Sequence, residues 1–231
     1  MSRPSLALVR VLRRKARSIR RILVTAGPTR EMLDPVRFIT NLSTGEMGYS
    51  VAREARRKGF QVTLISGPTS LTPPRGVRWV PIVTVKDLEA ALKKHFFNHD
   101  VLFMSAAVGD FLPVTRSSRK VPRKKTLKVL FRQSPDLVGT LARRKGDRIV
   151  IGFSLETNDW LRRSRKKRLK KHLDGIVANH FRPGHNPFGK TRARVALIDS
   201  EGARVFRFGS KPALARTLIR WAAGLAGRSK N

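Results

Sequence analysis

Residues 21–48, RILVTAGPTREMLDPVRFITNLSTGEMG, predict the first strand and the first helix of an α/β fold. The opening RILVTA is a β-branched apolar run that stops at Gly27-Pro28, as a buried parallel strand does before a loop. The end of the segment begins a predicted helix at 46–58, where apolar side chains recur at helical spacing. Gly59 suits the left-handed conformation of the residue that follows a helix. A strand, a long loop and a helix therefore follow one another here.

The same alternation recurs along the rest of the chain. We expect strands at 61–67, 77–83, 100–108, 148–154 and 174–179, and helices at 86–97, 135–145 and 158–171. Strands joined through helices need right-handed crossovers, which leave a sheet covered on both faces. Residues 192–199 and 203–209 alternate instead and predict a hairpin before a last helix from Lys211. The predicted fold is α/β and Rossmann-like, with three layers, a mainly parallel sheet and a C-terminal β-hairpin.

The charge of the chain is strongly positive. Fifty Lys and Arg stand against fifteen Asp and Glu among 231 residues, so the net charge is +35 and the surface attracts polyanions. The basic residues are spread along the whole chain and aromatic residues are only 7%, so no base-stacking platform can be identified. We therefore interpret the charge as a feature of overall composition and expect no specific nucleic-acid partner, although weak non-specific binding stays open.

Several features of the sequence concern its compartment. Cysteine is absent, which excludes disulfides and thiolate metal sites and fits a reducing compartment. The longest apolar runs are far shorter than the ~20 residues of a membrane helix, so we expect a soluble protein without a membrane partner. Residues 1–20 are Arg-rich, but the rest of the chain is nearly as basic, so they predict a basic leader more than a presequence. We expect a cytoplasmic protein, with an organelle as the alternative.

The loops that follow the strands are the candidates for a site, because ligands of such sheets bind at the carboxyl ends of the strands. Ser43-Thr44-Gly45 offers hydroxyls, backbone N–H groups and the positive end of a helix dipole, which together suit a phosphate. A plain helix cap by Ser43 or Thr44 is the alternative. The spacing fits neither the dinucleotide-binding G-x-G-x-x-G nor the Walker loop.

The quoted segment resembles the phosphopantothenoylcysteine synthetase family in three strings, AGPTRE, LDPVRFITN and STG-x-MG. The resemblance continues through SGPTSLTPP (66–74), SAAVGDF (105–111), SPDL (134–137), GFSLET (152–157) and DGIVAN (174–179). It spans about Ile22 to Phe208 and so covers nearly the whole chain. It implies a synthetase domain at 21–226, between the basic leader 1–20 and a tail at 227–231. It also implies a homodimer, which we expect to form through the hairpin at 192–209 or through the basic lid region at 118–128.

The resemblance also implies a two-step ligation in coenzyme A biosynthesis. The carboxylate of 4′-phosphopantothenate attacks the α-phosphate of CTP and releases pyrophosphate, and the cysteine amine then displaces CMP from the acyl-cytidylate. Mg²⁺ is the implied cofactor. Some relatives use ATP, so the nucleotide preference stays open. The flavoprotein decarboxylase that is usually fused to this domain in bacteria cannot fold from twenty residues. We expect either a separate decarboxylase partner or a chain that is a fragment.

Three catalytic residues follow from the resemblance. Asn41 matches the family residue tied to the acyl-cytidylate, and its amide could donate to an oxyanion and accept from the incoming amine. Arg37 could hold a carboxylate or phosphate bidentately, with a solvated Arg as the alternative. Lys120 is the predicted catalytic lysine of a basic lid at 118–128. Pro122 breaks the family spacing there, so Lys124 or Lys125 could take that role, or the run could be a solvated charged segment.

The remaining assignments concern the nucleotide. The predicted contacts are Gly27, Ser43, Thr44, Gly45, Met47, Ala106, Ala107, Asp110, Phe153, Asn179 and Lys124. Asp110 is the predicted ribose or metal contact, with a helix cap or turn as the alternative. Phe153 could equally be a core residue, and Asn179 could simply end a strand. Glu46 departs from the family, which has a lysine there, and an acid would repel a nearby triphosphate unless it faces solvent.

Two alternative functions agree with part of the sequence. A strongly basic surface would suit an NADP-dependent Rossmann oxidoreductase, but G-x-G-x-x-G is absent and the only tyrosine, Tyr49, forms no Tyr-x-x-x-Lys pair. A non-catalytic nucleic-acid-binding protein would bind DNA with a steep salt dependence and would not turn over nucleotide triphosphates.

Overall fold

The computed structural model describes residues 18–123, 125–181, 193–208 and 210–228, and within them the main sheet has eight strands in the order β12-β11-β10-β9-β6-β1-β4-β5. The parallel strands are β1 (Arg21–Ala26), β4 (Gln61–Ser66), β5 (Arg78–Pro81), β6 (Val101–Met104), β9 (Ile149–Glu156) and β10 (Gly175–His180). The antiparallel strands β11 (Ala193–Asp199) and β12 (Gly202–Phe208) form the C-terminal hairpin, with Asp199 opposite Gly202. The predicted fold class is confirmed.

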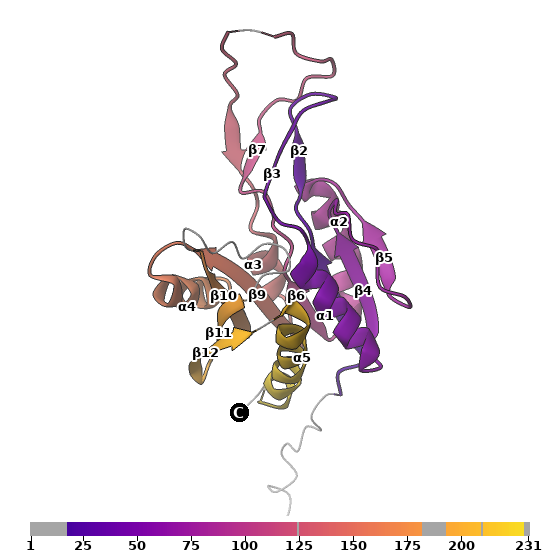
Figure 1. The fold of residues 1–231 in the computed structure, drawn as a ribbon, viewed down its shortest axis with the longest axis vertical. Helices are drawn as coiled ribbons and strands as arrows, with labels where there is room; N and C mark the ends of the chain where they lie inside the picture. Colours follow the sequence, from indigo (N-terminus) through magenta and orange to yellow (C-terminus); the bar gives the residue numbers. More distant parts are fainter. Residues whose placement is uncertain (1–17, 124, 182–192, 209, 229–231) are drawn as a thin grey trace, which may run out of the picture.

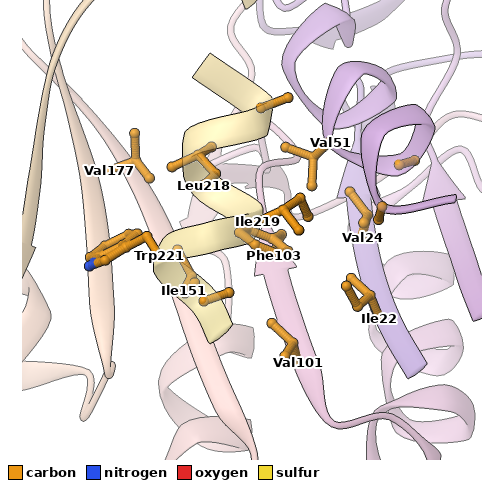
Figure 2. Packing of buried hydrophobic residues seen from close by; sticks show 14 of the residues in the cluster. Ile22, Val24, Val51, Val101, Phe103, Ile151, Val177, Leu218, Ile219 and Trp221 are labelled. Atoms are coloured by element: carbon orange, nitrogen blue, oxygen red, sulfur yellow. The ribbon is translucent and has the colours of Figure 1, made fainter. Parts of the chain in front are cut away.

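Helices cover both faces of the sheet (Figure 1). One layer contains α1 (Glu46–Arg57) and α5 (Lys211–Arg228), and the other contains α2 (Val85–His95), which continues into the 3₁₀ turn η2 (Phe96–Asn98), α3 (Leu137–Ala142) and α4 (Trp160–Lys170). Neighbouring residues of a strand point to opposite faces. Val24 accordingly packs on the α1 and α5 side, whereas Leu23 packs on the other. Figure 2 shows α5 laying Leu218, Ile219 and Trp221 against the sheet.

Two antiparallel ribbons project from one end of the sheet and form the long extension in Figure 1. The first pairs β2 (Arg30–Met32) with β3 (Phe38–Thr40), and the second pairs β7 (Phe111–Pro113) with β8 (Phe131–Gln133). The sequence predicted only loops at these places. Strands of three residues are too short for a recognisable alternation, so their pairing became visible only in the fold.

The predicted strand at 100–108 was too long, because β6 ends at Met104. Beyond Met104, hydrogen bonds that involve side chains replace the backbone pairing with β1. The Ala106 amide donates to Thr25 Oγ1 at 3.0 Å, and Ser105 Oγ donates to the Thr25 carbonyl at 2.5 Å. The predicted helix at 135–145 was also too long, because α3 extends only from Leu137 to Ala142. Asp136 caps its start by accepting a hydrogen bond from the Gly139 amide at 3.1 Å.

Other predictions on the chain ends and turns have mixed outcomes. Gly59 has a φ of 88°, so the predicted left-handed residue after α1 is confirmed. Most of the basic leader, residues 1–17, lies outside the described residues, as do the end of the tail, 229–231, and residue 192 at the predicted start of the hairpin. Among the described helices none combines the length and the apolar character needed to cross a bilayer.

Candidate functional site

A cavity of about 780 Å³ lies at the carboxyl ends of the central parallel strands. Loops from distant parts of the sequence meet there, as the topology of an open α/β sheet requires. Its lining includes 40–48 after the first ribbon, 104–108 and Asp110 after β6, 133–138 at the start of α3, 152–155 in β9, Lys167 and Lys171 of α4, Leu173, Ile176 and Asn179, and Lys211 of α5.

The start of α1 forms one wall of this cavity. Gly45 is the N-cap residue, with a φ of 79°, and no side chain caps the helix. The alternative of a Ser43 or Thr44 cap is therefore wrong. Ser43 Oγ instead accepts a weak hydrogen bond from the Gly45 amide at 3.3 Å, and a Cβ on Gly45 would lie 2.7 Å from Thr69 Cγ2. Backbone N–H groups without a side-chain cap and a positive helix end together suit an anion.

Asn41 lies in the cavity wall beside this helix start. Its Nδ2 donates to the Ala107 carbonyl at 3.0 Å, and that carbonyl also accepts from the Thr29 amide at 3.1 Å. The Ala107 amide donates in turn to the Gly27 carbonyl at 2.9 Å. The amide of Asn41 is thus fixed by backbone that follows β1 and β6, while its side chain stays exposed to the cavity.

The other predicted nucleotide contacts can be placed in the same way. Ser43, Thr44, Gly45, Met47, Ala106, Ala107, Asp110, Phe153 and Asn179 all line the cavity. Gly27 does not line it and packs behind Gly45 with a φ of 71°. Asp110 is exposed at the base of the second ribbon. Lys124 lies outside the described residues.

The structure adds charged residues that the sequence analysis missed. Asp136 forms an ion pair with Lys171 at 2.7 Å, and Lys167 forms one with the buried Glu156 at 2.5 Å. Burial raises the pKa of Asp136, but hydrogen bonds from Lys171 and from the Gly139 amide outweigh this and hold the pKa below its ordinary value. The i, i+4 spacing of Lys167 and Lys171 places both on one face of a helix and could have indicated that they act together. Residues 162–171 contain eight basic residues, so this pair could not be distinguished from the others.

Two of the predicted catalytic residues lie outside the cavity lining. Arg37 forms an ion pair with the buried Asp34 and also donates to the Val121 carbonyl. The Asp34 carboxylate accepts a hydrogen bond from the Val121 amide at 3.1 Å as well, so this pair joins the two projecting ribbons. The Arg37 guanidinium holds the pKa of Asp34 well below its ordinary value. Lys120 is exposed next to this contact and does not line the cavity.

Comparison with known proteins agrees with the α/β fold of this chain. Residues 18–225 match the family described as the DNA/pantothenate metabolism flavoprotein C-terminal domain. The chain belongs to this family. The same fold is found in the crystal structure of the C-terminal domain of coenzyme A biosynthesis bifunctional protein CoaBC. That structure is 32% identical, with a TM-score of 0.75, over 91% of this chain and 97% of that one.

The curated relatives of this chain include coenzyme A biosynthesis bifunctional proteins named CoaBC. Those of Vibrio cholerae and Escherichia coli K12 are each 36% identical, over 87% and 86% of this chain and 51% and 50% of their own lengths. The chain thus spans about half the length of the curated relatives it matches. A Cab2 mutant in complex with phosphopantothenate-cysteine shares the fold, with a TM-score of 0.76 at 18% identity over 92% of this chain and 89% of that one.

Asp110 is the carboxylate at the cavity that could take part in binding a divalent cation. The described residues contain no cluster of three or more His, Asp and Glu that could hold a metal by protein ligands alone. Mg²⁺, however, usually binds through one or two carboxylates together with substrate phosphates and water. Asp110 is exposed at the cavity, so it fits such a shared site, whereas Asp136 is already paired with Lys171.

Proposed function

We propose that the chain is a phosphopantothenate–cysteine ligase that uses CTP and acts in coenzyme A biosynthesis. The observation that carries the proposal is the position of Asn41: its amide is held by the Ala107 carbonyl in the same wall as the open start of α1. An anion-binding helix end and an oriented amide are the two features that nucleotide activation of a carboxylate needs.

In the first step, the carboxylate of 4′-phosphopantothenate attacks the α-phosphorus of CTP. A carboxylate oxygen–phosphorus bond forms, the bond to the β-phosphate oxygen breaks, and pyrophosphate leaves with the electron pair. The helix start at Gly45 faces the accumulating negative charge, and bound Mg²⁺, with Asp110 among its ligands, would neutralise part of it. Ala106 and Ala107 carry small side chains, which allow the nucleotide to approach the backbone after β6.

In the second step, the amine of cysteine attacks the activated carbonyl, an amide bond forms, and CMP leaves while the amine loses a proton. Negative charge develops on the carbonyl oxygen in the transition state. The Nδ2 group of Asn41 has a second hydrogen beside the one given to Ala107, and this hydrogen is the donor we assign to the developing oxyanion. Lys120 and Arg37 lie outside the cavity lining, so their proposed roles require the ribbons to bring them to a cavity in the assembled enzyme.

We further propose a homodimer formed through the two ribbons. They expose large apolar side chains, which are Val36, Phe38, Ile39, Phe111, Val114, Leu127 and Leu130. Leu130 is 74% exposed and Phe111 is 63% exposed. Monomeric proteins rarely expose a contiguous group of large apolar side chains, and such a patch often marks a protein–protein interface. A second copy offers the same surface and can cover it by two-fold symmetry. Sedimentation of the wild type should show a dimer, and Leu130→Glu combined with Phe111→Glu should shift it to monomer.

The direct test of the activity uses the purified chain with 4′-phosphopantothenate, cysteine and Mg²⁺, and with either CTP or ATP. Pyrophosphate and 4′-phosphopantothenoylcysteine should appear in equal amounts with CTP. Omission of cysteine should leave at most one pyrophosphate per site, because the acyl-cytidylate then stays bound. If neither nucleotide supports product formation, the ligase assignment is refuted.

A further inference from the structure

The first residue of α5, Lys211, is the most deeply buried cation in the cavity. Only 7% of its surface is exposed, yet it lines the cavity together with Glu46 in the first turn of α1. The two helices pack against each other, and both begin at the cavity. Two helices from opposite ends of the chain thus place one acid and one base at the same wall.

The position of Lys211 is unfavourable for a cation on two grounds. Burial removes water from the ammonium, and the start of α5 adds the positive end of a helix dipole. Burial accordingly lowers the pKa of Lys211, whereas the negative charge of Glu46 raises it. Glu46 supplies an opposite charge that offsets part of this desolvation.

The position of Glu46 is favourable for its own helix and unfavourable for an anionic ligand. An acid in the first helical turn stabilises α1 through the dipole. It also weakens the attraction that the uncapped helix start offers to phosphate. A cavity that is to bind a nucleotide triphosphate therefore needs a cation beside this acid.

We propose that Lys211 is a positioning residue that neutralises Glu46 and holds it away from the polyphosphate, so that the start of α1 remains an anion site. The inference rests on the proposed function and explains how this chain could bind phosphate next to Glu46. Lys211 acts through Glu46 and need not touch the nucleotide. The effect of losing Lys211 should therefore depend on whether Glu46 is present.

A double-mutant cycle tests this dependence, with titration calorimetry of CTP and of inorganic pyrophosphate as the readout. Lys211→Gln should weaken binding of both probes about tenfold, since the half-buried Glu46, without its compensating charge, then faces the phosphates. Glu46→Gln should change binding by no more than about threefold, and Lys211→Gln added to it should cost less than about threefold more. Lys211→Arg keeps the charge and should stay close to the wild type.

Two controls distinguish this role of Lys211 from a general effect of lost positive charge or lost stability. Lys58→Gln removes one positive charge just after the far end of α1, and it should leave CTP binding unchanged. The melting temperature of each variant is measured beside its binding, so that a loss of binding through unfolding is recognised as such.

The outcomes are distinct. An equal loss from Lys211→Gln in the wild-type background and in the Glu46→Gln background would overturn the proposal, because Lys211 would then act independently of the acid. No loss in either background would overturn it as well. A wild type that neither binds CTP nor forms product would instead refute the ligase assignment itself.

Discussion

Replacing Gly48 with alanine should move the start of α1, which we propose as the anion site. Gly48 lies in the first turns of α1 and is buried against β1. A Cβ at this position would lie 2.5 Å from Ala26 Cβ, 2.7 Å from Ser105 Oγ and 2.8 Å from the Thr25 carbonyl oxygen. Neither the Thr25 backbone nor the Ala26 methyl can move aside by rotation, so α1 itself must shift.

The magnitude follows from two opposing effects. Overpacking a rigid site costs about 1–3 kcal/mol, and here backbone is involved, so a value near 3 applies. Alanine in a helix interior recovers about 0.5–1 kcal/mol relative to glycine. The net loss of unfolding free energy for Gly48→Ala should be about 2 kcal/mol. The displaced helix start should also raise the KM for CTP.

Urea unfolding followed by tryptophan fluorescence measures this loss, since Trp221 is buried in the core that α5 shares with α1. Gly224→Ala is the matched control, because it lies in α5 and its Cβ would meet only Arg228 Nη2 at 3.8 Å. It should stabilise the protein by about 0.5–1 kcal/mol and leave the KM unchanged. Equal stabilisation by both substitutions would refute the close approach of α1 to β1.

The remaining predictions concern the cavity and the ribbons. Asn41→Ala and Asn41→Asp should keep the fold and the release of pyrophosphate but stop product formation, and ligation like that of the wild type would remove Asn41 from the mechanism. Lys120→Gln should slow the nucleotide-dependent first step, whereas an unchanged rate would move that role to Lys124 or Lys125. The pKa of Asp34 lies below its ordinary value of 3.8, so its pairing stabilises the fold above that pH and is lost as the pH falls through the lowered pKa. Unfolding free energies of the wild type and Asp34→Asn should therefore differ at pH 7 and converge in strong acid, and a constant difference would contradict this.

The strands and most helices could be predicted from the sequence because their signals are local. A buried parallel strand such as β1 must be apolar on both faces, and its predicted bounds, Arg21 to Ala26, agree with the structure. The topology then places loops after β1 and β6 at one cavity, as predicted for Asn41 and Asp110. The strings that resemble the synthetase family predicted the same residues.

Tertiary structure decided which charged groups line the cavity, because a single charged side chain carries no local signal in a chain of net charge +35. Arg37 was predicted at the substrate, but it is paired with Asp34 where the two ribbons meet. Lys211, more than 160 residues after Glu46 in the sequence, is brought to the same cavity wall by the packing of α5 on α1. The sequence by itself determined the layers and the end of the sheet at which the cavity lies. Only the fold determined the partners of each charge, since pairing depends on distances between segments that are remote in the chain.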